Sequence, residues 1–299
     1  NVAVGQAAMY TNTTSQPNVA VGFQSLYYNN GGIQNTAVGH QTLQSNTTGG
    51  SNTAVGHYTL FANTVGYDNT AVGTSALSSN ITSIENTAIG RSNSYSNNGG
   101  QYNTSIGAYG LFSNSTGNDN TAIGTRSLYS NTVGFSNTAV GKVALYSNTT
   151  GNANTGIGYA ALYSNTTGAN NTALGYNALY SNTGANNSTA VGYQTLYTST
   201  GDSNTAMGFN SMVYCTTGGS NVAVGRDTLA YNQTGQNNTA LGYSALLGVG
   251  GNSCSNNTAV GHVAMLSVTT GSANVAVGVN AGYQISTGIS NVFIGYGAG

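Results

Sequence analysis

The sequence predicts an all-β fold, a parallel β-solenoid (β-roll) of about 18 coils with a 17-residue repeat. Three observations lead to this prediction. A five-residue word, N-T/V-A-V/I/L-G, recurs along the whole chain, glycine closes every copy of it, and charged residues make up only 3% of the composition. The repeat covers residues 1–299, so we expect a single solenoid array, either part of a longer chain or one member of an end-to-end filament.

The spacing of the word defines the coils. It starts at Asn1 and recurs every 17 residues as far as Asn171 and then Ser188, where serine replaces asparagine. The remaining starts, through Asn291, follow at steps of 16, 17, 17, 19, 17 and 17, which gives 18 in all. We number each coil from position 1 at this residue.

Each coil reads as two short strands and two turns. The T-A-V segment at positions 2 to 4 alternates like a strand, and A-L-Y-S around positions 8 to 11 is the second expected strand. N-T-T-G at positions 12 to 15 has the composition of a turn. The glycine at position 5 marks a corner that excludes a Cβ atom. These structural corners run from Gly5 to Gly295, the first twelve being Gly5, Gly22, Gly39, Gly56, Gly73, Gly90, Gly107, Gly124, Gly141, Gly158, Gly175 and Gly192.

One coil is too small to bury a core, so the coils must stack, and we expect the aliphatic positions 4 and 9 to form the buried column. At about 4.8 Å per coil, 18 coils predict a rod of about 85 Å. Stacked like charges would repel by about 0.9 kcal/mol per pair even in water, which explains the uncharged composition. Uncharged amides can instead form ladders between coils. The expected ladder at position 1 comprises Asn18, Asn35, Asn52, Asn69, Asn86, Asn103, Asn120, Asn137, Asn154 and Asn171, and tyrosines at position 10, from Tyr129 to Tyr197, are expected to stack.

Composition also argues against several classes of function. No basic stretch is present that could neutralise phosphates, so we expect no nucleic-acid partner. No apolar run approaches the roughly 20 residues of a membrane span. Both terminal segments are consensus repeats without charges that would block strand pairing, so we expect the array to continue into further chain or to meet another copy.

The words NTAVG, NTAIG and NVAVG, followed by xxAL, resemble the head repeats of trimeric autotransporter adhesins and the β-roll repeat shafts of phage and viral tail-fibre proteins. The resemblance covers the whole chain. It implies a left-handed parallel β-roll, a homotrimer, and display outside a cell or virion for attachment. Two features differ from the usual adhesin pattern. The repeat is longer than the usual adhesin head repeat by an Asn/Thr-rich turn, and we expect no stalk, membrane anchor or C-terminal chaperone domain within these 299 residues.

No residue pattern predicts catalysis, a resident metal or a cofactor. His40 and His57 occupy position 6 of adjacent coils and are weak metal-site candidates, since two histidines without a carboxylate or thiolate make a poor site. Asp68 and Glu85 share position 17 of successive coils, but no nucleophile or base accompanies them. We expect no enzyme activity.

The two cysteines and the asparagines of the turns lead to two further expectations. Cys215 and Cys254 lie two coils apart, about 10 Å along the stack, which is beyond disulfide reach. They are expected to be separate thiols. Asn-x-Ser/Thr sequences in the turns provide possible glycosylation sites. These are Asn12, Asn46, Asn80, Asn114, Asn148 and Asn165, at or beside position 12.

The leading functional hypothesis is a structural protein, the rigid extracellular or surface-displayed shaft or head of a fibre, which associates with itself as a homotrimer or filament. An alternative is a carbohydrate-binding adhesive module that contacts surface glycans or a host receptor through exposed tyrosines, with Tyr159, Tyr176 and Tyr193 at position 6 as candidates. Ice binding through the position-2 threonines is a third hypothesis, weakened because the aliphatic position 4 prevents a T-x-T array.

Overall fold

The computed structural model describes residues 1–13 and 17–299, and within these residues the chain is all-β, with eighteen three-residue strands. The chain divides into two compact units, Asn1–Asn152 and Ala153–Gly299. Each unit contains nine described strands, and each strand belongs to a different coil. The predicted fold class, a parallel β-solenoid with a 17-residue repeat, is confirmed.

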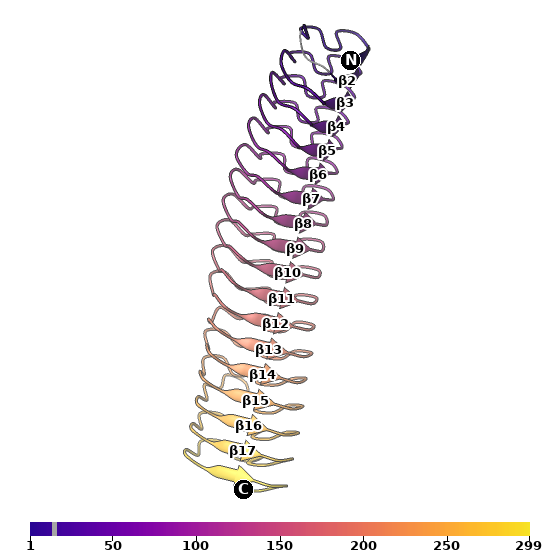
Figure 1. Cartoon of the computed structure of the whole chain (residues 1–299). Helices are drawn as coiled ribbons and strands as arrows, with labels where there is room; N and C mark the ends of the chain where they lie inside the picture. Colours follow the sequence, from indigo (N-terminus) through magenta and orange to yellow (C-terminus); the bar gives the residue numbers. More distant parts are fainter. Residues whose placement is uncertain (14–16) are drawn as a thin grey trace. The chain divides into compact units, whose positions relative to one another are not determined.

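Within each unit the strands stack in chain order as a parallel ladder (Figure 1). Residues pair with their copies one coil away, as Thr36 does with Thr53. The strands of the first unit are β1 (Val2–Val4), β2 (Val19–Val21), β3 (Thr36–Val38), β4 (Thr53–Val55), β5 (Thr70–Val72), β6 (Thr87–Ile89), β7 (Thr104–Ile106), β8 (Thr121–Ile123) and β9 (Thr138–Val140). Those of the second are β10 (Thr155–Ile157), β11 (Thr172–Leu174), β12 (Thr189–Val191), β13 (Thr205–Met207), β14 (Val222–Val224), β15 (Thr239–Leu241), β16 (Thr258–Val260), β17 (Val275–Val277) and β18 (Val292–Ile294).

The position-5 glycines form the corner that follows each strand. All eighteen have φ between 121° and 142°, a backbone conformation that side chains with a Cβ rarely adopt. Where the preceding coil belongs to the same unit, the backbone N–H of the corner glycine donates to the position-4 carbonyl of that coil, as Gly73 does to Val55 at 2.8 Å. A Cβ at Gly73 would lie 2.6 Å from the carbonyl oxygen of Gly90 in the next coil. The corner is therefore restricted to glycine by both φ and contact between coils.

The expected second strand is wrong. Positions 6 to 11 form turns, and positions 7 and 9 adopt left-handed backbone conformations, as Gln41 and Leu43 do with φ of 50°. A left-handed non-glycine residue costs about 1–2 kcal/mol, which burial of a leucine side chain at about 1.5–3 kcal/mol offsets. The segment still bonds between coils, because the N–H of Leu43 donates to the Thr59 carbonyl at 3.0 Å. Parallel stacking is thus maintained without extended backbone.

Only half of the predicted core is correct. Position 9 is fully buried, as in Leu43 and Leu179, but position 4 points away from the core and Leu174 is 45% exposed. The strand residue that enters the core is the alanine at position 3, as in Ala173. The narrow coil accepts one large side chain, at position 9, opposite one small side chain at position 3.

Asparagine ladders fix the coils to one another, and the position-1 ladder predicted from the sequence is present. Asn120 donates from its backbone N–H and from Nδ2 to Oδ1 of Asn103, at 3.0 and 3.2 Å, and from Nδ2 to the Gly134 carbonyl at 2.8 Å. A second ladder, not predicted, runs along position 12. Asn131 Nδ2 donates to Asn114 Oδ1 at 2.8 Å and to the same Gly134 carbonyl at 2.9 Å. The position-15 carbonyl therefore accepts hydrogen bonds from the asparagines of both ladders, and these bonds close the coil.

The position-10 rings stack within each unit, as the tyrosine spacing predicts. In the second unit Tyr163, Tyr180 and Tyr197 stack with centroids 5.1 Å apart. In the first unit Tyr129 and Tyr146 stack at 5.2 Å. Burial, followed by repulsion from the neighbouring phenol groups, raises the pKa of Tyr180. The ladder thus disfavours charge on its own members, in agreement with the uncharged composition.

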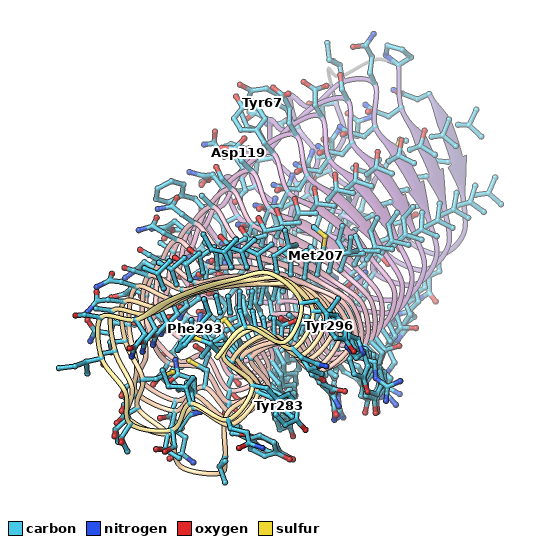
Figure 2. All side chains as sticks on the ribbon, turned by 90° about the horizontal axis from the view of Figure 1, so that it is seen from below. Tyr67, Asp119, Met207, Tyr283, Phe293 and Tyr296 are labelled. Atoms are coloured by element: carbon cyan, nitrogen blue, oxygen red, sulfur yellow. The ribbon has the colours of Figure 1, made fainter. Side chains whose placement is uncertain are left out.

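Two departures from the repeat compensate for each other in the last two coils. Gly282 replaces leucine at position 9, and Phe293 replaces alanine at position 3 of the following coil. Phe293 lies inside the last coil, where a Cβ on Gly282 would be 3.0 Å from Phe293 Cδ2 (Figure 2). The large and small side chains have exchanged positions while still filling the same space.

This exchange predicts a double-mutant cycle. Gly282→Leu should collide with the Phe293 ring, and Phe293→Ala should leave a cavity, so each single change lowers the free energy of unfolding. The double variant restores the consensus pair and should be more stable than the summed single effects by about 1–3 kcal/mol. Chemical denaturation followed by circular dichroism measures all three, and strict additivity of the two changes would contradict the proposed exchange.

Candidate functional site

The most continuous exposed feature of the second unit is the row of position-6 side chains. Its aromatic part contains the predicted surface residues Tyr159, Tyr176 and Tyr193 and continues to Phe209, each between 43% and 46% exposed. Successive ring centroids lie 5.0, 5.4 and 5.2 Å apart, with interplanar angles of 8° to 11°. The structure therefore brings the three predicted tyrosines together in one ladder. We call this ladder the position-6 row.

Stacking limits what the position-6 row can contact. A ring stacked on both sides has its faces covered by its neighbours, so Tyr176 and Tyr193 present ring edges and hydroxyl groups outward. Sugar rings that pack on aromatic side chains use the ring face. The row is consequently a surface of edges and hydroxyl groups rather than a set of open stacking platforms.

A second exposed surface was missed by the sequence reasoning. Position 4 of the strands is aliphatic or Met and is exposed or half-buried, and it shares the outer side of the sheet with position 2, usually threonine. Leu174, Met207 and Leu241 are between 45% and 48% exposed, and Met207 is labelled in Figure 2. None of the strand residues in either unit carries a charge. We call this surface, positions 2 and 4 of β1 to β18, the sheet face.

A sequence signal for the sheet face did exist. Position 4 varies among Val, Ile, Leu and Met, whereas position 3 is nearly always Ala. A narrow interior tolerates one side-chain size, while an exposed row tolerates several. Variation in size at position 4 could therefore have indicated the outward face. Threonine at position 2 shares this face, and the ice-binding hypothesis stays a prediction.

The histidine pair does not form a convergent ligand set. The His40 and His57 rings stack with centroids 4.9 Å apart, and Tyr58 packs edge-on against His57 at 4.1 Å. In stacked imidazoles the nitrogen lone pairs lie in the parallel ring planes rather than pointing at a common centre. No group of three or more His, Cys, Asp or Glu residues that could hold a metal occurs among the residues described.

The predicted glycosylation sites lie at position 12, within the second asparagine ladder, and Asn80 occupies this position like the other five. Asn46, Asn80, Asn114, Asn148 and Asn165 are at most 1% exposed, and Asn46 Nδ2 donates to Asn29 Oδ1 at 2.7 Å. A glycan on Nδ2 would break the ladder and require space in the core. These five residues therefore do not offer a row of acceptor sites. Asn12 is half-buried, and Thr14 of its sequence lies outside the described residues.

We expect folded chain secreted from a glycosylating host to carry no glycan at the five buried position-12 residues. Any mass above 30.1 kDa should map to Asn12 or to the exposed Asn-x-Ser/Thr sequences at Asn170, Asn187, Asn237 and Asn256. A glycan at a buried position 12 should prevent its coil from closing, so modified chains should be protease-sensitive. Intact-mass spectrometry before and after glycosidase measures this. A protease-resistant chain that loses mass from Asn114 or Asn148 would contradict the expectation.

The cysteines are separate free thiols, as their spacing predicts, and both are buried. Cys215 takes the place of asparagine in the position-12 ladder, and Asn232 Nδ2 in the next coil is buried without a hydrogen-bond partner. Burial raises the pKa of Cys215 to about 11 and that of Cys254 to about 12. Neither thiol is thus a nucleophile near neutral pH.

Burial of the two thiols leads to two predictions, one on how stability changes with pH and one on how slowly the thiols react with an alkylating reagent. Their folded pKa values exceed the ordinary value of 9.0, so the stability they contribute is present below pH 9 and is lost as pH rises through the range between 9 and 12. At pH 8 we expect iodoacetamide to leave both thiols unmodified in the folded chain and to modify both in denaturant. Peptide mass spectrometry measures this, and rapid labelling of the folded chain would contradict it.

Comparison of the chain with protein-family models, curated proteins and solved structures gave no match. In the described part of the chain, no helix is long and apolar enough to cross a membrane. Function therefore has to be argued from the exposed rows and their chemistry.

Proposed function

We propose that this chain is a structural repeat protein of an extracellular fibre, in which copies associate through the sheet face. The observation that carries the proposal is the continuity of the ladders. Position-1 asparagines, glycine corners and buried position-9 side chains repeat coil after coil in each unit, and the position-1 asparagines bond to their copies in the neighbouring coils. Such stacking gives mechanical stiffness and repeats one surface many times, which favours multivalent contact.

A second copy is the occupant we propose for the sheet face. Nine strands spaced at about 4.8 Å, each three residues wide, give a face of about 430 Å² per unit. One unit from each of two copies would bury about 860 Å² in total, the size of a weak interface, so repetition of the contact along an assembly has to supply its stability. The face carries no charge, so identical faces do not repel one another. A homotrimer and an open filament are the two assemblies in view.

Charge placed on the sheet face tests this proposal. The variant Leu174→Lys/Met207→Lys/Leu241→Lys changes three exposed side chains of the second unit, and Tyr176→Lys is a control at the exposed position-6 row. Sedimentation velocity should show oligomers for the unchanged chain and the control, and monomers for the triple variant. A monomeric unchanged chain at high concentration would refute self-association. Mass per unit length from electron microscopy of native fibres separates one chain from three.

Carbohydrate binding by the position-6 row is a second candidate, supported by the exposure of Tyr159, Tyr176 and Tyr193. Their stacked geometry restricts contact to ring edges and hydroxyl groups. Binding of the chain to a glycan array, lost with Tyr176→Ala, would support this function. Array binding that survives the substitution would remove the row as its cause.

A further inference from the structure

The repeat departs from its consensus at position 10 in three successive coils of the second unit, residues 204–220, 221–237 and 238–256. In the coils before them the tyrosine is at position 10, as in Tyr180 and Tyr197. In the first two of these coils position 10 is Val213 and Ala230, and the tyrosine has moved to position 11. The aromatic side chain that would stand beside position 7 is thereby removed, and a hollow opens there.

The hollow has a volume of about 280 Å³. Tyr214 and Tyr231, stacked with centroids 5.2 Å apart at 16°, line it from position 11, and Tyr243 lines it from position 6. The small side chain of Ala230 lies between these positions and leaves the space open. We call this hollow the coil-14 pocket.

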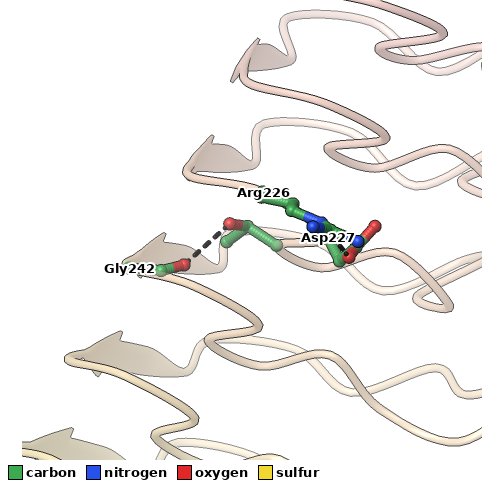
Figure 3. Close-up of polar contacts among 4 residues, drawn as sticks. Arg226, Asp227 and Gly242 are labelled. Carbon is green, nitrogen blue, oxygen red and sulfur yellow. Dashed lines mark hydrogen bonds and ion pairs between the residues drawn. The ribbon is translucent and has the colours of Figure 1, made fainter.

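Polar groups of two kinds line the coil-14 pocket. Asp227 carries the only ion pair found among the described residues, in which Arg226 Nε donates to Asp227 Oδ2 at 3.1 Å (Figure 3). The Arg226 guanidinium lies 5.4 Å from the Phe209 ring centroid and 5.8 Å from that of Tyr243, contacts that orient it. Asn210 contributes an amide whose Oδ1 is buried without a hydrogen-bond partner. Next to Asp227, Thr228 Oγ1 donates to the Gly242 carbonyl at 2.9 Å and ties this coil to the next.

We propose that the coil-14 pocket binds a neutral sugar ring. Arg226 does not line the pocket, but its ion pair neutralises the charge of Asp227, which disfavours ionic ligands, and the Asp227 carboxylate can still accept hydrogen bonds from hydroxyl groups. The Asn210 side chain and three tyrosine side chains in the lining suit a ligand that alternates hydroxyl and C–H groups. The volume is slightly below the range typical of drug-sized ligand pockets, so it fits one ring rather than an extended chain. This inference does not depend on fibre formation, because the site lies within a single chain.

Saturation-transfer NMR on the 299-residue chain tests the pocket, with glucose, galactose, mannose, N-acetylglucosamine and choline as probes at 10 mM, about the concentration that weak binding requires. The decisive variant is Ala230→Tyr/Tyr231→Ser, which restores the consensus L-Y-S-N in this coil and should close the hollow without loss of stability. Asp227→Asn removes the carboxylate charge at constant volume. Tyr67→Ala, at an exposed tyrosine of the first unit, is the control outside both the pocket and the position-6 row, and Tyr176→Ala tests the row itself.

We expect at least one neutral sugar to show saturation transfer, reduced at least about tenfold by each pocket variant and unchanged in the control. Circular dichroism and the thermal midpoint verify that the variants are folded. Transfer to no sugar, transfer to choline alone, or a signal lost with Tyr176→Ala but retained in the consensus-restoring variant would each overturn the proposal.

Discussion

Asn120→Asp should be among the most destabilising single substitutions in the first unit, by about 3–5 kcal/mol. The change preserves shape but replaces Nδ2, which donates to Asn103 Oδ1 and to the Gly134 carbonyl, with an oxygen that faces both acceptors. Asn120 is fully buried, so water cannot screen the new charge. The midpoint of urea denaturation, followed by circular dichroism, measures the loss.

Asn98→Asp provides the matched control, since it makes the same chemical change at an exposed position of the same unit. It should alter stability by less than about 0.5 kcal/mol. Equal losses in the two variants would assign the effect to net charge rather than to the ladder. No loss at Asn120 would show that the ladder does not hold the coils together.

Gly242→Ala should likewise lower the free energy of unfolding by at least about 3 kcal/mol. At this corner φ is +131°, and a Cβ would lie 2.5 Å from the carbonyl oxygen and 2.8 Å from the carbonyl carbon of Gly261 in the next coil. Both neighbours are backbone atoms, so they cannot rotate aside as a side chain could. Relief would require the two coils to separate and to lose the bonds between them.

Gly250→Ala, in the same coil, is the control for this corner. A Cβ there would meet no atom within 4 Å, and the substitution restricts the unfolded chain. It should therefore be neutral or stabilising by up to about 1 kcal/mol. Thermal denaturation of both variants distinguishes the cases, and a Gly242→Ala chain as stable as the Gly250→Ala chain would contradict the restriction of the corner to glycine.

The exposed surfaces could be predicted only in part. The position-6 tyrosines were identified because they recur at one repeat position, and their stacking followed from the spacing of the coils. The coil-14 pocket was not predicted from the sequence. It arises from a one-residue shift of tyrosine from position 10 to position 11, and this shift does not disturb the repeat period. Its polar lining also depends on Asp227, whose ion pair with Arg226 lies within a single coil and does not recur in the other coils described.

The sequence by itself determined the period, the parallel register, the glycine corner and the position-1 ladder. Each of these follows from placing identical residues one coil apart, and requires no knowledge of the path within a coil. The tertiary structure alone decided which side of each three-residue strand faces inward. Alternation in T-A-V fits either side, and the choice falls on Ala173 rather than Leu174 because the coil is too narrow for two large side chains. The backbone path from position 6 to position 11 was likewise decided by stacking. The position-9 leucine adopts a left-handed backbone conformation that leucine locally disfavours, and burial of its side chain between stacked coils offsets this cost.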